Sequence, residues 1–304
     1  MNPILAVGSV AFDSIKTPFG EASRVVGGAA TYFAIAASFF TEVRIVAVVG
    51  DDFGANVEKV FGGRRIDLAG LEKVPGDTFR WKGEYGFDLN SRETVYTHLN
   101  VFEKFTPKIP TAHKSSPFVF LGNIHPTLQI DVLNQVQKPR LVGADTMNYW
   151  IERTPDELKQ VLNRVDVLLI NDSEARELAG EANLVKAARK VQAMGPKTLV
   201  IKRGEHGVLM TRPAGGFFAA PAMPLEEVFD PTGAGDTFAG GFLGYLASCD
   251  TVDDGSLARA IIYGSTLASF AVEDFSVDRL LRLTHEEVTE RFNEFKRLTH
   301  FDVV

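Results

Sequence analysis

Residues 230–238 read Asp-Pro-Thr-Gly-Ala-Gly-Asp-Thr-Phe, and the rest of the chain can be organised around this stretch. The Asp230-Pro231 pair disfavours helix at residue 230 and indicates a loop. The run Gly233, Ala234, Gly235 leaves the backbone bare, so its N–H groups can approach an anion closely. Apolar residues then recur at helical spacing, namely Phe238, Phe242, Leu243 and Leu246. The stretch therefore predicts a loop that leads into a buried helix.

The start of that helix is suited to phosphate, because unpaired N–H groups and the positive end of the helix dipole lie there. Asp236 falls in the first helical turn, beside the predicted anion site. A well-capped core helix with an aspartate in its first turn explains the same residues. For the pattern Gly-Ala-Gly-Asp alone, that simpler interpretation is favoured, because short motifs recur by chance.

The composition limits the classes of partner. The 304 residues carry a formal net charge of -7, and 45% are hydrophobic, as in ordinary globular proteins. This acidic balance gives no support for nucleic acid or an anionic membrane as a partner. Cys249 is the one cysteine, which excludes an intramolecular disulfide and a cysteine-rich zinc site. Without a signal-peptide pattern or an apolar run long enough for a bilayer, we expect a cytoplasmic protein.

Aliphatic runs typical of buried parallel strands alternate with helical patterns along the chain. This alternation predicts an α/β fold with a mostly parallel sheet and right-handed crossovers. Polar residues follow each run, and the carboxyl ends of parallel strands meet at one edge, where such sheets bind ligands. The residues that follow strands include Asp13, Asn123, Asn171, Glu174, Arg203, Gly204 and Gly207.

Residues 74–106 lose the helical period and alternate with period two on both sides of the turn-rich stretch 88–92. They predict a β-hairpin or small sheet, and residues 14–26 predict a short hairpin or loop. The small sheet is either a lid over a substrate site or an edge extension of the main sheet. Phe79 and Trp81 share one of its faces and suit stacking on a sugar ring or nucleobase.

Residues 230–238, with the Ala-Gly-Gly-Phe that follows, closely resemble the C-terminal signature of the PfkB (ribokinase-like) family of sugar and nucleoside kinases. Gly27-Gly28 resembles the N-terminal Gly-Gly element of that family, and residues 50–54 resemble its Gly-Asp-Asp turn. The family usually has an asparagine a few residues after the two glycines, where this chain has Thr31 and Tyr32. This departure weakens the expectation of ribose-type hydroxyl recognition there.

The resemblance implies a three-layer α/β/α ribokinase-like fold with a mostly parallel central sheet. It implies one kinase domain over residues 1–304, with a small β-sheet lid formed by about 14–26 and 74–106. The family often dimerises through that lid, so a homodimer is expected. The reaction would transfer the γ-phosphoryl group of ATP to a hydroxyl of a sugar, cyclitol or nucleoside, and the sequence leaves the choice of acceptor open.

The resemblance also implies roles for individual residues. Asp236 would be the general base, and the N–H groups of Gly233, Ala234 and Gly235 would form the anion hole. The acceptor site would contain Asp13, Gly27, Gly28, Phe79, Trp81 and Asn123. The ATP site would contain Asn171, Arg203, Gly204, Gly207, Thr232 and Phe275. Glu174 would help to hold Mg²⁺ through water, and Asp230 with Ser276 is a candidate site for a monovalent cation such as K⁺.

Other interpretations remain for some of these features. Asp51 and Asp52 fit capping of the next helix better than catalysis, and Asn171 with Glu174 also fits a helix cap. A nicotinamide dehydrogenase and a Walker-type ATPase are disfavoured, because neither glycine-rich motif is present. A catalytically weak protein that senses a sugar or nucleotide on the same fold is the alternative function, although the intact Gly-Ala-Gly-Asp argues against it.

Overall fold

A nine-stranded sheet forms the centre of the protein in the computed structural model, which describes residues 2–300. Seven neighbouring strands run parallel, and two strands at one edge are antiparallel. The central parallel strands are almost wholly buried, which explains their aliphatic sequences. The order across the sheet is β13 (Phe217–Ala220), β12 (Val208–Thr211), β11 (Thr198–Lys202), β10 (Val167–Asn171), β9 (Leu141–Asp145), β8 (Phe118–Leu121), β1 (Ile4–Val7), β4 (Val43–Val49) and β5 (Ile66–Lys73).

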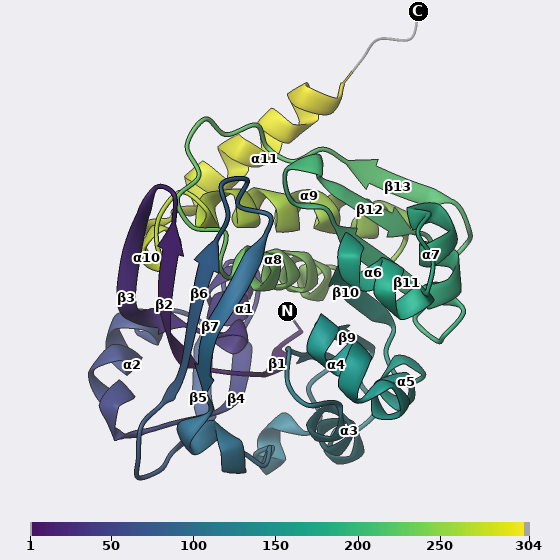
Figure 1. The fold of residues 1–304 in the computed structure, drawn as a ribbon. Helices are drawn as coiled ribbons and strands as arrows, with labels where there is room; N and C mark the ends of the chain where they lie inside the picture. Colours follow the sequence, from purple (N-terminus) through teal and green to yellow (C-terminus); the bar gives the residue numbers. More distant parts are fainter. Residues whose placement is uncertain (1, 301–304) are drawn as a thin grey trace, which may run out of the picture.

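Helices cover both faces of this sheet and give the fold three layers (Figure 1). Ile4 and Ala6 of β1 join one hydrophobic core, whereas Leu5 and Val7 join the other. The first core includes residues of α1 (Ala29–Ala37), α2 (Gly54–Phe61), α8 (Ala234–Ser248), α9 (Asp254–Ala271), α10 (Asp278–Arg282) and α11 (His285–Thr299). The second includes residues of α3 (Pro126–Gln135), α4 (Asn148–Arg153), α5 (Pro155–Leu162), α6 (Asp172–Ala179) and α7 (Leu184–Gln192). Among the described residues, no helix is both long enough and apolar enough to cross a bilayer.

A second, four-stranded sheet stands beside the main body (Figure 1, purple and blue). Its order is β3 (Gly20–Gly27), β2 (Ala11–Thr17), β6 (Phe79–Tyr85) and β7 (Arg92–His98). The central pair β2–β6 is parallel, and each outer strand forms a hairpin with its neighbour. The predicted small sheet is therefore confirmed. One detail differs, because Asp13 lies inside β2 rather than in a turn after the first strand.

The predicted helix-capping role of Asp51 and Asp52 is wrong. The two residues form a short 3₁₀ turn with Phe53, and no side chain caps either this turn or α2. Asp52 instead accepts hydrogen bonds from the N–H and hydroxyl of Thr78, at 2.8 and 2.6 Å, and from Arg80 at 3.2 Å. The 3₁₀ turn moves the carboxylate away from the cap position, and Asp52 anchors the first residues of β6 to the main body.

Candidate active site

The first turn of α8 is built for the close approach of a ligand. Gly233 precedes the helix with φ of 74° in the left-handed region, which a side chain would strain. A methyl group at this position would also overlap the ring of Tyr32. Ala234, Gly235 and Asp236 follow as the first helical residues, and no side chain caps them. The N–H groups of this turn therefore have no side-chain partner, and that of Ala234 donates to the carbonyl of Pro231 at 3.3 Å. A helix start without a side-chain cap is what an anion site requires.

Two further carboxylates and one lysine lie around that turn, which itself carries Asp236. Asp145 ends β9, Glu174 lies in the first turn of α6, and Lys202 ends β11. The Nζ atom of Lys202 lies 3.5 Å from Oδ2 of Asp145. A methyl group at Gly235 would lie 2.9 Å from the same Nζ. With Asp236, these residues form what we call the strand-end cluster: Asp145, Glu174, Lys202 and Asp236.

The strand-end cluster has more negative than positive charge, and its pKa values reflect this. Burial and the charge of Asp145 raise the pKa of Asp236 to about 7 and that of Glu174 also to about 7. Burial raises the pKa of Asp145 as well. For Lys202, burial lowers the pKa, but the three carboxylates outweigh it and raise the pKa. A site with this imbalance favours an added cation or a proton.

Asp13 lies close enough to Asp236 for their charges to interact, and it is 4% exposed. It accepts a hydrogen bond from the N–H of Gly28, and a methyl group at Gly27 would overlap its carboxylate. Burial and the charges of Asp230 and Asp236 raise the pKa of Asp13 to about 7. The two glycines therefore hold Asp13 against the start of α1, which explains why the sequence has no side chain at either position.

The β6–β7 hairpin of the small sheet contacts the same site. Tyr85 Oη lies 3.0 Å from Oγ1 of Thr232, so the small sheet contacts the loop before α8. Arg92 lies over the ring of Trp81, at 5.3 Å from its centroid, and its charge lowers the pKa of Asp13. The charge of Arg92 also lowers the pKa values of Glu174 and Asp236. Trp81 itself stands opposite Asp13 in the β2–β6 register.

Two other residues predicted for the acceptor site have different surroundings. Phe79 packs on Phe102, with ring centroids 5.5 Å apart, at the opposite end of β6 from Tyr85. Asn123 follows β8, and its Oδ1 accepts a hydrogen bond from Nε1 of Trp150 at 2.9 Å. Trp150 fixes the orientation of this amide. Contacts of Phe79 and Asn123 with an acceptor therefore stay predictions.

Four of the six residues predicted for the ATP site lie at the end of β10 and on the turn after β11, and they are Asn171, Arg203, Gly204 and Gly207. Asn171 and Glu174 form a complete capping box, in which each side chain accepts from the other residue's N–H at 2.8 Å. The N–H of Arg203 donates to the carbonyl of Gly207 at 2.8 Å and closes the next turn. A methyl group at Gly204 would lie 2.8 Å from Oδ1 of Asn90, in the β6–β7 turn. The small sheet therefore contacts this turn as well.

Asp230 fixes the loop before α8 to the segment after α9. Its Oδ1 accepts from the N–H of Thr232 at 2.8 Å, and its Oδ2 accepts from the N–H of Ser276 at 3.1 Å. Ser276 has φ of 62°, and its hydroxyl donates to the carbonyl of Val26. Asp230 is 1% exposed, and burial raises its pKa. Both carboxylate oxygens therefore have backbone partners at the candidate cation site.

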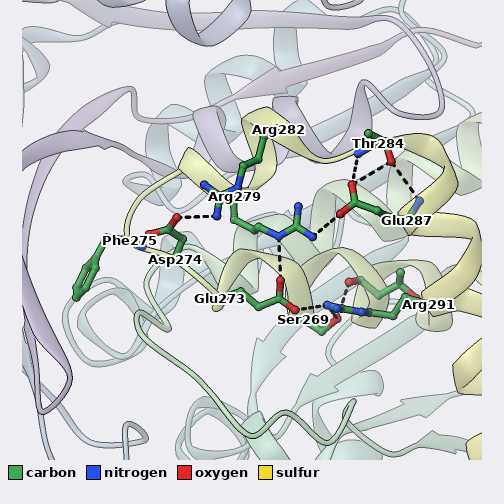
Figure 2. Close-up of polar contacts among 10 residues, drawn as sticks. Ser269, Glu273, Asp274, Phe275, Arg279, Arg282, Thr284, Glu287 and Arg291 are labelled. Carbon is green, nitrogen blue, oxygen red and sulfur yellow. Dashed lines mark hydrogen bonds and ion pairs between the residues drawn. The ribbon is translucent and has the colours of Figure 1, made fainter.

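Ion pairs hold the segment that carries Ser276 (Figure 2). Glu273 accepts from Arg279 at 2.9 Å and pairs with Arg291 at 2.6 Å, and Arg279 also binds Glu287 at 2.7 Å. We call these four residues the α9–α11 network. The ring of Phe275 points away from it (Figure 2) and meets the β2–β3 turn, where a methyl group at Gly20 would lie 3.2 Å from the ring.

Several residues of the site were missed by sequence reasoning. They are Asp145, Lys202 and Arg92 among the charged groups, and Tyr32 and Tyr85 among the phenols. Asp145 and Lys202 end all-aliphatic strands, so their position at the carboxyl edge of a parallel sheet was a usable signal. Tyr32 was noted only as a departure from the family's usual asparagine, because a tyrosine in an apolar helix is indistinguishable from a core residue.

Comparison with known proteins identifies the family. A model described as "pfkB family carbohydrate kinase" matches residues 2–281. The chain belongs to the pfkB family of carbohydrate kinases. It is therefore a kinase, a phosphotransferase with an alcohol group as acceptor. It is 32% identical over 250 residues to a cytidine kinase of Thermococcus kodakarensis, an alignment that covers 80% of this chain and 88% of the relative. A nucleoside kinase of Methanothermobacter thermautotrophicus is 25% identical, with 89% of each chain covered.

Solved structures show that the fold is ribokinase-like. A ribokinase of Arabidopsis thaliana, solved with ribose and ATP, superimposes with a TM-score of 0.78 at 18% identity. The alignment covers 96% of this chain and 98% of the ribokinase. A nucleoside kinase of Methanocaldococcus jannaschii gives a TM-score of 0.77 at 19% identity, with 97% and 99% covered. The mostly parallel sheet and the small sheet of this pfkB kinase are thus those of its fold family.

Proposed function

We propose that this pfkB kinase transfers the γ-phosphoryl group of ATP to a hydroxyl of a sugar, cyclitol or nucleoside, with Asp236 as general base. The observation that carries the proposal is the position of Asp236. It lies in the first turn of α8, beside uncapped N–H groups, and burial with the charge of Asp145 raises its pKa to about 7. A base of that pKa can both take and release a proton at neutral pH.

The proposed step is an in-line displacement at the γ-phosphorus. The Asp236 carboxylate takes the proton of the acceptor hydroxyl while the acceptor oxygen bonds to phosphorus. The bond from phosphorus to the bridging β–γ oxygen breaks, and ADP leaves with that electron pair. The N–H groups of Gly233, Ala234 and Gly235 stabilise the charge of the transferring group. Asp236 then releases its proton to solvent or to product.

Lys202 supplies the positive side chain nearest to that group. Its Nζ lies beside Gly235 and is held by Asp145 from the opposite side. We assign it to the oxygens of the transferring phosphoryl group, because an ammonium ion in a buried site stabilises a developing anion strongly. Asp145 is then a positioning residue, since it fixes Lys202 without touching the substrate.

The residues around Glu174 fit a metal that is held mainly by phosphate oxygens and water. Glu174 uses one carboxylate oxygen in the capping box, and the described residues contain no group of three metal-ligating acids, histidines or cysteines. Mg²⁺ commonly takes only one or two protein carboxylates beside substrate phosphates. When bound with ATP, it would neutralise phosphate charge and complete the charge balance of the strand-end cluster. We place a monovalent cation such as K⁺ beside Asp230 and Ser276.

The remaining predicted contacts complete the proposal. The acceptor would lie between Asp13, Gly27-Gly28 and Trp81 of the small sheet, which acts as the lid. The phosphates of ATP would lie along Asn171, Thr232 and the Arg203–Gly207 turn, with the adenine towards Phe275. Among acceptors, nucleosides come first, because the cytidine kinase relative has the higher identity of the two reported. We also propose a cytoplasmic homodimer that covers the exposed outer strand β7 of the lid.

The test is ADP release on a panel of cytidine, adenosine, ribose, fructose and myo-inositol, for the wild type and Asp236→Asn. We expect the substitution to lower kcat by about 10²- to 10⁴-fold while ATP still binds. Asp156→Asn is the matched control, since Asp156 also lies in a first helical turn but is exposed on α5. An Asp236→Asn enzyme with unchanged turnover would refute the base assignment. A wild type that binds a member of the panel but phosphorylates none of them would favour the sensing alternative.

A further inference from the structure

A cavity of about 360 Å³ lies where the tips of the small sheet meet the main body. The β2–β3 turn contributes Phe19, the β6–β7 turn contributes residues 87–89, and the loop before α8 contributes residues 226–229. None of these residues belongs to the strand-end cluster or to the acceptor and nucleotide sites proposed above. The volume lies in the range of small-molecule pockets, roughly 300–1,000 Å³. The cavity is therefore a candidate for a second binding site.

Three phenylalanine rings line this cavity from three separate segments, and they belong to Phe19, Phe87 and Phe229. Phe87 is 91% exposed and Phe19 is 56% exposed, whereas Phe229 is half-buried. One exposed aromatic side chain is ordinary on a protein surface, but several that gather around a hollow mark a binding surface. The rings therefore favour a ligand that makes contact with their faces.

The β6–β7 turn presents its side chains to the cavity at a conformational cost. Leu89 has φ of 56°, in the left-handed region that a bulky side chain rarely adopts. Its N–H donates to the carbonyl of Gly86 at 3.0 Å. The carboxylate of Asp88 accepts from the N–H groups of Asn90 and Ser91, at 3.1 and 3.2 Å. The turn is thus held in a strained conformation, which is typical of functional sites.

The charged groups at the cavity are all negative. They are the carboxylates of Asp88, Glu226 and Glu227, and no lysine, arginine or histidine is among the lining residues. Hydrogen bonds from the N–H and the hydroxyl of Ser91 hold the pKa of Asp88 below its usual value, so this carboxylate stays ionised at neutral pH. Within residues 2–300, none of the three carboxylates has an ion-pair partner. A cation that enters the cavity would therefore meet unpaired negative charge.

Aromatic rings and carboxylates together recognise one class of ligand. The face of an aromatic ring attracts an ammonium group within about 6 Å of its centre, and aromatic cages bind quaternary ammonium ions in this way. Carboxylates at the rim add a Coulomb attraction. The same carboxylates repel an anionic ligand such as a nucleotide, and a neutral apolar ligand would use the rings alone. The cavity is thus most complementary to an organic cation.

We propose that this cavity is a second binding site, which takes a small organic cation, such as a quaternary ammonium ion or an arylalkyl amine. The charged end of the ligand would lie against the rings of Phe87 and Phe229, near Glu226 and Glu227. Its apolar body would lie against Leu89. The site goes beyond the proposed function, because neither the phosphoryl donor nor the acceptor is assigned to these residues.

Calorimetric titration of the full chain with two cations and their neutral counterparts tests the proposal. Choline is paired with 3,3-dimethylbutan-1-ol, and phenethylamine is paired with 2-phenylethanol, so that each pair differs chiefly in charge. We expect at least one cation to bind with a Kd below about 1 mM, and its neutral counterpart to bind at least about tenfold more weakly. The titration is repeated with a saturating non-hydrolysable ATP analogue, because Phe275 contacts Gly20 in the same β2–β3 turn. The analogue should leave the Kd unchanged.

Two variants locate the binding. Phe87→Ala removes one ring from an exposed turn and should raise the Kd about 2- to 30-fold, the loss of one cation–π contact. The double variant Glu226→Gln with Glu227→Gln should raise the Kd about 2- to 10-fold, because exposed charges are partly screened. The matched controls are Val95→Ala, exposed on β7 of the same sheet, and Glu294→Gln on α11. Both controls should bind the cation as the wild type does.

The proposal would be overturned by cations that bind no better than their neutral counterparts, or by competition with the ATP analogue. A Kd that neither Phe87→Ala nor the double variant changes would overturn it too, and so would the failure of both cations to bind. These measurements need no turnover, so they test the cavity even if the base assignment fails. A cavity that binds no cation would leave the proposed function intact.

Discussion

The strand-end cluster and the α9–α11 network are both charged, yet they are built in opposite ways. The network has two carboxylates and two guanidinium groups, with each charge paired at 2.6 to 2.9 Å. The strand-end cluster has three carboxylates, one ammonium group and one ion pair at 3.5 Å. Glu287 in the network has a pKa lowered to about 2, by hydrogen bonds from Thr284 and by Arg279. Glu174 and Asp236 in the cluster have pKa values of about 7.

Burial alone does not explain this contrast. Burial is the largest cause of the raised pKa values of Asp236 and Glu174, whereas the side chain of Glu287 is 37% exposed. The second difference is the number of opposite charges and hydrogen-bond donors that meet each carboxylate. A network in which each charge is satisfied stabilises the fold. A cluster with surplus negative charge costs stability until a cation, a proton or a substrate arrives, which is the arrangement expected of an active site.

The largest effect should follow from removing the cation of the strand-end cluster. Lys202→Met is expected to lower kcat by about 10²- to 10³-fold, the effect of one lost oxyanion donor. The control is Lys197→Met just before the same strand, because Lys197 is 74% exposed and pairs with Asp166 away from the site. Steady-state kinetics with varied concentrations of ATP and acceptor would measure the loss of kcat in both variants. A loss below about threefold, the size of an ordinary surface change, would mean that Lys202 only neutralises its neighbours.

The second prediction is that a substitution raises the free energy of unfolding, whereas most substitutions lower it. The pKa of Asp236 is raised in the folded state, so its protonated form stabilises the fold at low pH, and that contribution is lost as pH rises through about 7. Asp236→Asn should therefore be more stable than the unliganded wild type at pH 8, by about 1–3 kcal/mol. The advantage should shrink towards pH 5. Denaturant unfolding at both pH values measures it, and a destabilised variant at pH 8 would contradict the surplus of negative charge.

The sequence predicts the central strands of the fold well. The aliphatic runs of β1, β8 and β10 have no other reasonable interpretation, and each ends in polar residues that the fold brings to one edge. The signature loop and the capping box of Asn171 and Glu174 could also be placed from local patterns, whereas Asp13 was expected in a turn and lies inside β2. Strand β5 was not predicted, because it is an edge strand whose residues are mostly half-exposed and lack a clean alternation.

Contacts between distant segments could not be predicted in the same way. Nothing near Lys202 in the sequence indicates that Asp145 and Gly235 lie beside it, since their meeting depends on strand order. The role of Asp52 likewise depends on Thr78, 26 residues away. The four residues of the α9–α11 network lie on the turn after α9, on α10 and on α11, and only their packing shows which charges pair. Charge pairs between distant segments are thus the part of a site that is hardest to predict from a single sequence.

The third prediction tests the network. Glu273→Gln removes the carboxylate that two arginines share and should destabilise the protein by about 1–2 kcal/mol, because Arg279 and Arg291 each lose a charged partner. The kcat of the folded enzyme should change by less than about twofold, the opposite of the effect at Lys202. Glu294→Gln is the control, since Glu294 lies 3.9 Å from Arg297 on the exposed side of α11. Impaired turnover with normal stability would place the network in catalysis.

The smallest effect should come from Glu287, at the more exposed end of the network. Its pKa is lowered to about 2, so its contribution to stability is present above the usual glutamate pKa of 4.5 and is lost as pH falls towards 2. Its side chain is 37% exposed, and solvent screening limits the cost of Glu287→Gln to about 0.5–1 kcal/mol at pH 7. Unfolding measured from pH 7 to 3.5 should show that the free energies of unfolding of Glu287→Gln and the wild type converge. Those of Asp236→Asn and the wild type should converge between pH 8 and 5. A cost independent of pH would mean that Glu287 acts through packing and the cap at Thr284 rather than through its charge.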